Sequence, residues 1–148
     1  MGTVMIARDL NLDTYFVGLK YFEKIRKKVD HPSATQIAHA LDRLQQDIDN
    51  VTRTVEVWRM PTSESLTNQF CMQLQGEQGK FIISLAKDYE MFATPNFDMN
   101  LGARGTISVI GNMWASSYVC TNFEMAKEIA IEFALKGTLA YPEIWEIL

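Results

Sequence analysis

The chain has 148 residues, of which 47% are hydrophobic and 22% charged, and these proportions exclude general disorder. A chain of this length can bury most of its unfolded surface in one core, so residues 1–148 are treated as a single domain. The sequence contains no apolar run of the roughly 18 residues that a membrane helix needs and no apolar leader, so we expect no membrane association and a cytoplasmic protein.

The charged residues are unevenly distributed, although the net charge is only −4. Residues 1–28 carry six Lys or Arg against three acids, whereas residues 29–148 carry eight against fifteen. An acidic body argues against nucleic-acid binding and favours a basic partner. The basic stretch from Lys20 to Lys28 could bind phosphate, but a solubilising helix end explains it better because Glu23 interrupts it.

The first third of the chain contains one ambiguous segment and one clear helix. Apolar spacing over residues 14–29 fits an amphipathic helix, which we favour, while the letters TYFVGLKYF would equally suit a strand. Ser33 can cap a second helix over residues 34–48. The apolar stripe of this helix has spacings of four, three and four residues: Ile37, Leu41, Leu44 and Ile48.

From Thr52 the hydrophobic period changes from 3.6 to 2, which indicates strands. Residues 76–79 (GEQG) predict a hairpin turn, and Gly111 predicts a bulge or a point of close approach. Strands joined by short turns pair antiparallel. The expected strands cover residues 54–60, 70–74, 80–86, 89–93 and 105–114.

The chain ends in a helix and an aromatic tail. Thr121 opens a capping box with the sequence TNFE, and Gly137 provides a left-handed stop. Ile131 and Leu135 lie opposite the apolar face, so something should cover them, and residues 141–148 are the nearest candidate. The apolar face itself consists of Phe123, Ala126, Ile129, Ala130 and Phe133.

These elements predict an α+β fold in which an antiparallel sheet of four to six strands is packed with N-terminal helices and a C-terminal helix. Cys71 and Cys120 both lie in strand-like apolar segments. In a reducing compartment we expect them to be buried free thiols.

The chemistry-bearing residues form no recognisable catalytic motif. His31 and His39 lack metal-ligand spacing, and no G-x-S-x-G elbow is present. Residues 76–80 (GEQGK) lack the distant Gly and the following Ser or Thr of a phosphate loop. The alternative that Cys120 acts as a nucleophile beside a histidine distant in sequence stays open. We otherwise predict no enzyme activity, no metal and no cofactor.

Three carboxylates form the cluster that is best able to carry chemistry: Asp88, Glu90 and Asp98. We expect Asp88 and Glu90 to project from the same face of a strand. Two close carboxylates can support acid–base hydrolysis. They equally suit a solvated sheet face, or an acidic patch that meets Lys and Arg on a partner.

The order of the elements and the C-terminal motifs support a resemblance. A strand ends in Trp114, and then come Ile129-Ala130-Ile131-Glu132-Phe133, Gly137 and Tyr141-Pro142-Glu143-Ile144-Trp145. This pattern resembles the small cytosolic immunity proteins of bacterial polymorphic-toxin and contact-dependent growth inhibition systems, in particular their first-numbered superfamily. The similarity covers about residues 100–148 and the strand region in outline.

The resemblance implies a monomer that has no active site and neutralises a cognate toxin domain, such as a nuclease or deaminase, by occluding it one to one. A basic toxin would be steered onto an acidic inhibitor. Trp58 is a further possible anchor, although we expect it to lie in the buried core. Alternatives are an adaptor or oligomeric structural protein that associates through Ile131 and Leu135, and a carboxylate-dependent hydrolase. The expected toxin-binding residues are Asp88, Tyr89, Glu90, Phe97 and Asp98.

Overall fold

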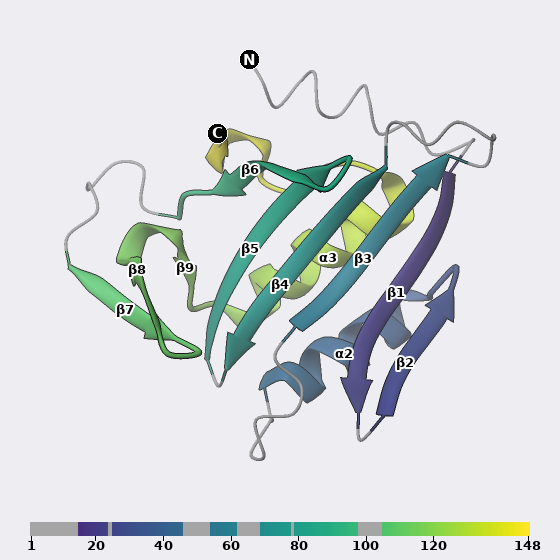
Figure 1. The fold of residues 1–148 in the computed structure, drawn as a ribbon, viewed down its shortest axis with the longest axis horizontal. Coiled ribbons are helices and arrows are strands. Elements are labelled where there is room, and N and C mark those ends of the chain that lie inside the picture. Colours follow the sequence, from purple (N-terminus) through teal and green to yellow (C-terminus); the bar gives the residue numbers. More distant parts are fainter. Residues whose placement is uncertain (1–14, 24, 46–53, 62–68, 78, 98–104) are drawn as a thin grey trace.

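The computed structural model describes residues 15–23, 25–45, 54–61, 69–77, 79–97 and 105–148, and Figure 1 shows how their elements are arranged. The described helices are α2 (Ala34–Gln45) and α3 (Phe123–Lys136), with short 3₁₀ turns η2 (Ser116–Tyr118) and η3 (Pro142–Ile144). The strands are β1 (Tyr15–Glu23), β2 (Ile25–Asp30), β3 (Thr54–Pro61), β4 (Phe70–Glu77), β5 (Lys80–Lys87), β6 (Glu90–Pro95), β7 (Thr106–Val109), β8 (Asn112–Ala115), β9 (Val119–Cys120) and β10 (Trp145–Ile147).

Eight of these strands form one antiparallel sheet in the order β10-β6-β5-β4-β3-β1-β2, with β9 paired to β5. Consecutive strands are mostly neighbours, because short connections favour antiparallel pairing. Among the described residues β2 pairs only with β1 and forms one edge of the sheet. The hairpin of β7 and β8 is a separate two-stranded sheet.

Both helices lie on one face of the large sheet and contact each other (Figure 1). α2 packs on β1, β3 and β4, while α3 packs on β3 and β5. Strands β3 and β4 send alternate residues toward the helices, as the pleat of a strand requires. The fully buried residues of this core include Leu19, Ile37, Leu41, Leu44, Val55, Val57, Phe70, Met72, Leu74, Phe81, Ile83, Ile129 and Phe133.

The ends of the two helices follow local capping chemistry. The Ser33 hydroxyl accepts from the Gln36 backbone N–H at 3.2 Å, and the Gln36 side chain accepts from the Ser33 N–H, which confirms the predicted cap of α2. α3 starts one residue later than predicted, because the Asn122 side chain rather than Thr121 accepts from a backbone N–H. Gly137 ends α3 at φ 68°, as predicted.

A buried arginine connects the sheet to the end of α3. Arg59 lies in β3 on the helix-covered face and is fully buried. Its guanidinium donates to the carbonyl oxygens of Phe133 and Ala134 at 3.3 and 2.8 Å. These carbonyls belong to the last turn of α3, where a cation is favoured by the helix dipole.

The expected fold class is wrong in two respects. The sheet is larger than four to six strands, and the N-terminal helix predicted over residues 14–29 is instead the hairpin of β1 and β2. This segment pairs with β3, and Val17 and Leu19 both face the helices from alternate positions of β1, as the pleat of a strand requires. The predicted stripe residue Ile48 lies outside the described residues.

The strand predicted over residues 105–114 is also wrong, because this segment forms the hairpin of β7 and β8. Ile110 and Gly111 both adopt positive φ, 50° and 77°, which is the backbone of a type I′ hairpin turn rather than a bulge. None of the helices in the described ranges is long and apolar enough to cross a bilayer.

Candidate protein-binding face

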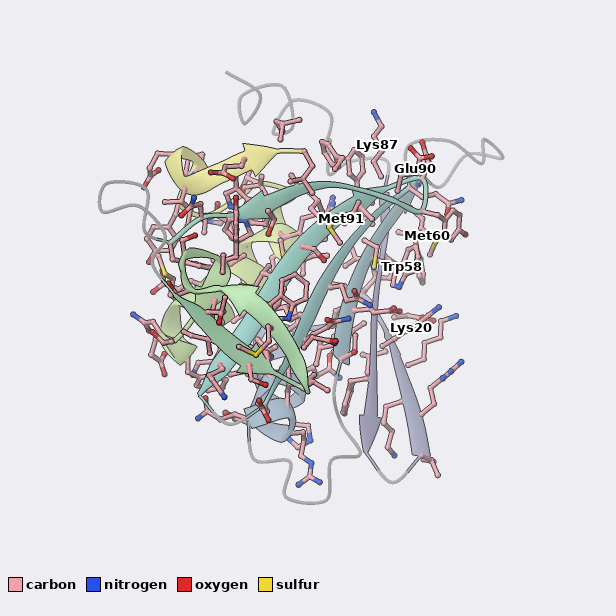
Figure 2. All side chains as sticks on the ribbon, turned by 60° about the vertical axis from the view of Figure 1, so that its left-hand side comes forward. Lys20, Trp58, Met60, Lys87, Glu90 and Met91 are labelled. Carbon is pink, nitrogen blue, oxygen red and sulfur yellow. The ribbon has the colours of Figure 1, made fainter. Side chains whose placement is uncertain are left out.

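Among the described residues no helix covers the second face of the large sheet, which we call the open face. Antiparallel partners share a face, so the register places Lys20, Glu56, Gln73 and Ser84 in one row across four strands. A second row runs through Trp58, and Figure 2 shows the side chains of this face from β1 to the β7–β8 hairpin. The open face is therefore more polar at its centre than the helix-covered face.

Large apolar side chains are exposed around this polar centre. Met91, Met113 and Leu148 border one groove with exposed fractions of 55, 64 and 64%, and Tyr89, at 78%, lies beside Trp58. Single exposed apolar residues are ordinary, but a gathering of several marks an interaction surface. Methionine and aromatic residues are also the types enriched at protein interfaces.

Trp58 is held in place by three neighbours on the open face. Its indole N–H donates to the Glu56 carboxylate at 3.1 Å, and the Lys20 ammonium lies 5.3 Å from its ring centroid. The Tyr89 ring lies 5.9 Å away at a tilt of 57°. Trp58 is half-buried and faces away from the helices, so the expectation that it belongs to the core is wrong.

A groove separates the open face from the β7–β8 hairpin. Its volume is about 510 Å³, within the range of ligand-binding clefts. Its walls are formed by residues of β4, β5, β6, β8 and η2 and by the C-terminal residue. The lining residues are Gln73, Gln75, Ile82, Ser84, Met91, Thr94, Met113, Trp114, Ala115, Tyr118 and Leu148, and none of these side chains is charged.

Hydrogen bonds fix the hairpin that forms the outer wall of the groove. The Ile110 N–H donates to the Glu77 carboxylate at 3.2 Å, and the Lys80 ammonium donates to the Ser108 carbonyl at 2.8 Å. Glu77 and Lys80 also form an ion pair at 3.3 Å. A small apolar cluster beneath the hairpin contains Ile82, Val109 and Val119, with Ile107, Ile110 and Trp114 packed against it.

The two cysteines are buried free thiols, as predicted. Burial raises the pKa of Cys71 from 9.0 to about 12, the nearby Glu56 carboxylate adds to this shift, and Lys20 opposes it. Burial also raises the pKa of Cys120, whose Sγ contacts the Asn122 carbonyl at 3.2 Å. Thiols held in the protonated form are poor nucleophiles.

The histidines are not placed beside Cys120. His31 packs on Phe16 at 4.7 Å and His39 on Tyr21 at 6.2 Å, so both lie near β1, whereas Cys120 pairs with β5. The part of the chain that the structure describes contains no group of three His, Cys, Asp or Glu that could hold a metal ion.

The predicted toxin-binding residues do not form one cluster. Asp88 and Tyr89 form the turn between β5 and β6 at φ 51° and 71°, and the Asp88 carboxylate accepts from the Gln69 N–H at 2.9 Å. Asp88 therefore stabilises a turn and does not share a strand face with Glu90, which begins β6 and is exposed. Asp98 lies outside the described residues.

Phe97 lies beyond the far end of β6 from Tyr89. It is half-buried against the main core, and its N–H donates to the Ser117 carbonyl at 2.7 Å. At about 3.3 Å per residue of extended strand, the seven residues from Glu90 to Phe97 span about 23 Å. Of the predicted set, Tyr89 contacts the open face directly and Glu90 lies at its margin (Figure 2).

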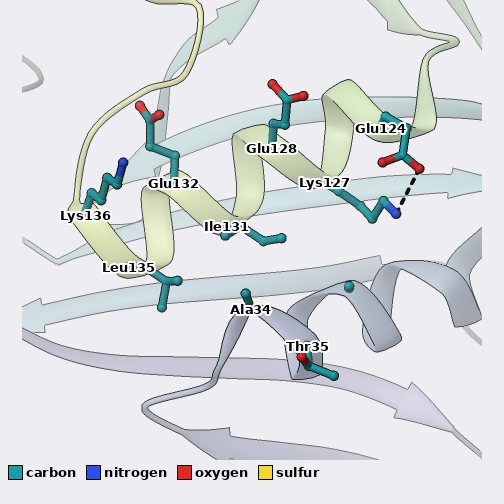
Figure 3. A pocket seen from close by; sticks show the side chains of 10 residues that line it. Ala34, Thr35, Glu124, Lys127, Glu128, Ile131, Glu132, Leu135 and Lys136 are labelled. Carbon is teal, nitrogen blue, oxygen red and sulfur yellow. Dashed lines mark ion pairs between the residues drawn. The ribbon is translucent and has the colours of Figure 1, made fainter.

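Acidic residues gather on the opposite side of the molecule, along α3. Glu124, Glu128 and Glu132 border a second groove of about 510 Å³ between α2 and α3 (Figure 3). Ile131 is half-buried and Leu135 is 46% exposed in this groove.

The C-terminal tail does not cover Leu135, so that prediction is wrong. Tyr141 reaches α3 and its hydroxyl donates to the Glu128 carboxylate. The chain then continues away to β6, where Trp145 pairs with Pro95. The tail therefore extends the sheet.

Sequence reasoning missed most residues of the open-face groove. One signal was available: in the segment FCMQLQ the polar residues Gln73 and Gln75 alternate with Met72 and Leu74, so one face of β4 had to be polar. Met91, Met113 and Leu148 carried no such signal, because the groove brings together segments that are distant in sequence.

In the described part of the chain, a large antiparallel sheet carries α2 and α3 on one face, and no described helix covers the other face. The model of the family of unknown function DUF6911 matches residues 14–141, so the chain belongs to this family. No curated protein matches the chain. A solved structure, described as a hypothetical protein from Neisseria gonorrhoeae, is similar in fold with a TM-score of 0.62 and 13% identity, covering 88% of this chain and 94% of that chain.

Proposed function

We propose that this protein is a cytoplasmic immunity protein that neutralises a cognate toxin domain by binding it through the open face. The observation that carries the proposal is the gathering of the exposed Tyr89, Met91 and Met113 side chains on a sheet face that no helix of the described residues covers. The resemblance of residues 100–148 to immunity proteins supports the choice of a toxin as the partner. Binding alone would inhibit, because occlusion needs no chemistry in the inhibitor.

The open face has the size and composition that such a complex needs. Strands of about eight residues and a strand spacing of about 4.8 Å give a surface of roughly 25 by 20 Å across β1, β3, β4, β5 and β6. With the hairpin added, this approaches the roughly 800 Å² per partner of a standard interface. Tyr89 and Trp58 are the expected anchors, since aromatic residues dominate the binding energy of interfaces.

The charges suggest separate roles for attraction and contact. The net charge of −4 would steer a basic toxin toward the protein over distance. The groove of the open face has no charged lining side chain, so close contact there would be apolar. We therefore expect added salt to slow association of the complex while leaving its dissociation rate nearly unchanged.

The test uses the cognate toxin domain, which we expect to be encoded immediately upstream of this reading frame, at the end of a large secreted protein. Its affinity for the wild-type chain and two variants is measured by calorimetry, and inhibition of its activity is measured in parallel. Tyr89→Ala should weaken binding by about 30-fold, the effect of a hot-spot residue worth about 2 kcal/mol. Leu135→Ser is the matched control, because it removes an exposed apolar side chain from the opposite side of the molecule.

If Tyr89→Ala binds fully and Leu135→Ser does not bind, the interface lies on the helices and not on the open face. No binding by the wild-type chain, or toxin activity that continues in the complex, would end the proposal.

One observation favours a second candidate, an oligomeric adaptor that associates through the α2–α3 groove. Leu135 remains 46% exposed above Ile131, and the tail leaves this groove open (Figure 3). Light scattering distinguishes the two functions: a stable dimer that Leu135→Glu separates into monomers supports the adaptor, whereas a wild-type monomer contradicts it.

A further inference from the structure

We infer that the groove between the open face and the β7–β8 hairpin takes up an uncharged, extended peptide segment of the protein partner. This inference rests on the proposed function, since it assigns to the bound protein a segment that enters the groove. Four observations carry it: the uncharged lining, the amide groups on the floor, the fixed outer wall and the methionines at the margin.

The lining selects against charge. All eleven lining side chains are uncharged, and apolar walls come from Ile82 in β5, Trp114 in β8 and Leu148 at the end of the chain. A charged group that enters such a groove loses its hydration without meeting a lining side chain of opposite charge. The occupant is therefore an uncharged group with apolar side chains.

The floor offers hydrogen bonds that suit a peptide backbone. The Gln75 side-chain N–H donates to the Gln73 side-chain oxygen at 3.3 Å. This bond leaves the Gln73 amide nitrogen as a donor and the Gln75 amide oxygen as an acceptor on the same face of β4. The two residues are about 6.8 Å apart along the strand. An extended chain presents N–H and C=O groups on one edge at this same two-residue interval.

The outer wall is held in position before any ligand arrives. Bonds from Glu77 and Lys80 fix the turn and the first strand of the hairpin, as described above. A preformed groove lowers the ordering cost of binding. Met91 and Met113 lie at the groove with more than half of each residue exposed, and their flexible side chains can adapt to different apolar residues.

The test is a nuclear magnetic resonance titration of the full chain, labelled with ¹⁵N and with ¹³C at the methionine methyl groups. The probes are three blocked tetrapeptides, acetyl-Ala-Leu-Ala-Leu-amide and its analogues in which Glu or Lys replaces the first leucine. We expect saturable shifts of the Met91 and Met113 methyl signals and of the Gln73 and Gln75 side-chain amides. The neutral peptide should bind at least tenfold more tightly than either charged analogue.

Two variants test the role of the floor. The double variant Gln73→Ala, Gln75→Ala should weaken the neutral peptide about tenfold, while Gln45→Ala, which changes the last residue of α2, should bind it like the wild type. Equal affinity for neutral and charged peptides would overturn the inference, as would saturable shifts confined to residues outside the groove.

Decanol serves as a further probe, because an apolar groove can also bind a small lipophilic molecule. If decanol gives saturable shifts and the neutral peptide gives none up to millimolar concentration, the occupant is lipophilic and the peptide assignment is wrong. If neither probe binds while the toxin domain still binds in a Tyr89-dependent manner, the groove inference fails and the proposed function stands. If the neutral peptide binds and the toxin domain does not, the groove inference stands and the proposed function fails.

Discussion

The two faces of the large sheet use the same strands for different purposes. On β4 the residues Met72 and Leu74 face the helices and are fully buried, whereas Gln73 and Gln75 face the groove and are half-buried. The helix-covered face consists of aliphatic and aromatic residues packed together, and the open face carries its large apolar residues at the margins. This difference indicates that the first face maintains the fold, and that the second can be altered with little loss of stability.

The largest expected effect is a loss of stability from a substitution on the helix-covered face, compared with a substitution on the open face of the same strand. Leu74→Ala removes a fully buried side chain and should lower the free energy of unfolding by about 2–5 kcal/mol. Gln75→Ala, on the next residue of the same strand, should change it by no more than about 0.5 kcal/mol. Urea unfolding of both variants measures the two values. Similar losses for the two variants would show that the open face is part of the stabilising core.

A second change concerns the one cation in the helix-covered core of the described residues. Arg59→Met removes the donor to the last carbonyl groups of α3 and should cost about 1–3 kcal/mol, because buried carbonyl oxygens lose a charged partner. Hydrogen exchange should increase most in the last turn of α3. Lys136→Met changes an exposed cation in the same turn and should alter stability by less than about 0.5 kcal/mol. Unchanged exchange in Arg59→Met would contradict this role.

A pH experiment tests the open face, because Cys71 is buried there beside Trp58. Its pKa is raised from 9.0 to about 12 in the folded protein, so the folded state favours the neutral thiol. The resulting stability is fully present below pH 9 and is lost as the pH rises toward 12. The slope is at most about 1.4 kcal/mol per pH unit. Cys71→Ala should lose stability less steeply than the wild type between pH 9 and 11, and equal slopes would show that the Cys71 thiol is not responsible.

The smallest effect separates two neighbouring candidates for the cap of α3. Asn122→Ala should cost about 1 kcal/mol, because the Met125 N–H loses its side-chain acceptor. Thr121→Ala should cost less than about 0.5 kcal/mol, since the exposed Thr121 side chain does not cap the helix. Thermal unfolding of both variants provides the comparison. A larger loss in Thr121→Ala would show that Thr121 caps the helix, as the sequence predicted.

The sequence predicted those elements whose local pattern agrees with their final environment. The 3.6-residue period and the glycine stop of α3 are local signals, and the buried face of this helix matches the prediction. The prediction for the segment of β1 failed because the residues of TYFVGLKYF fit both the helical and the strand period. Pairing with β3, more than thirty residues later, determines its conformation. A single window of sequence does not contain that information.

The candidate site was less predictable for a related reason. Tyr89 was selected from local pattern and charge, since it lies between Asp88 and Glu90, but only the fold shows that Trp58 on β3 contacts it. Asp88 was selected for its charge, although the backbone uses its carboxylate to hold a turn. Arg59 was not singled out from the sequence, and only the folded structure shows that a helix end accepts its hydrogen bonds.

The edge strand β2 has a consequence for how the protein behaves at high concentration. An edge exposes unpaired backbone groups that invite another chain to add a strand, and the sequence IRKKVD places three consecutive cations there. Two such edges repel each other, so copies of this protein should resist polymerising into fibres through β2. Replacing Lys27 and Lys28 with threonine would remove this protection and should promote aggregation during prolonged storage.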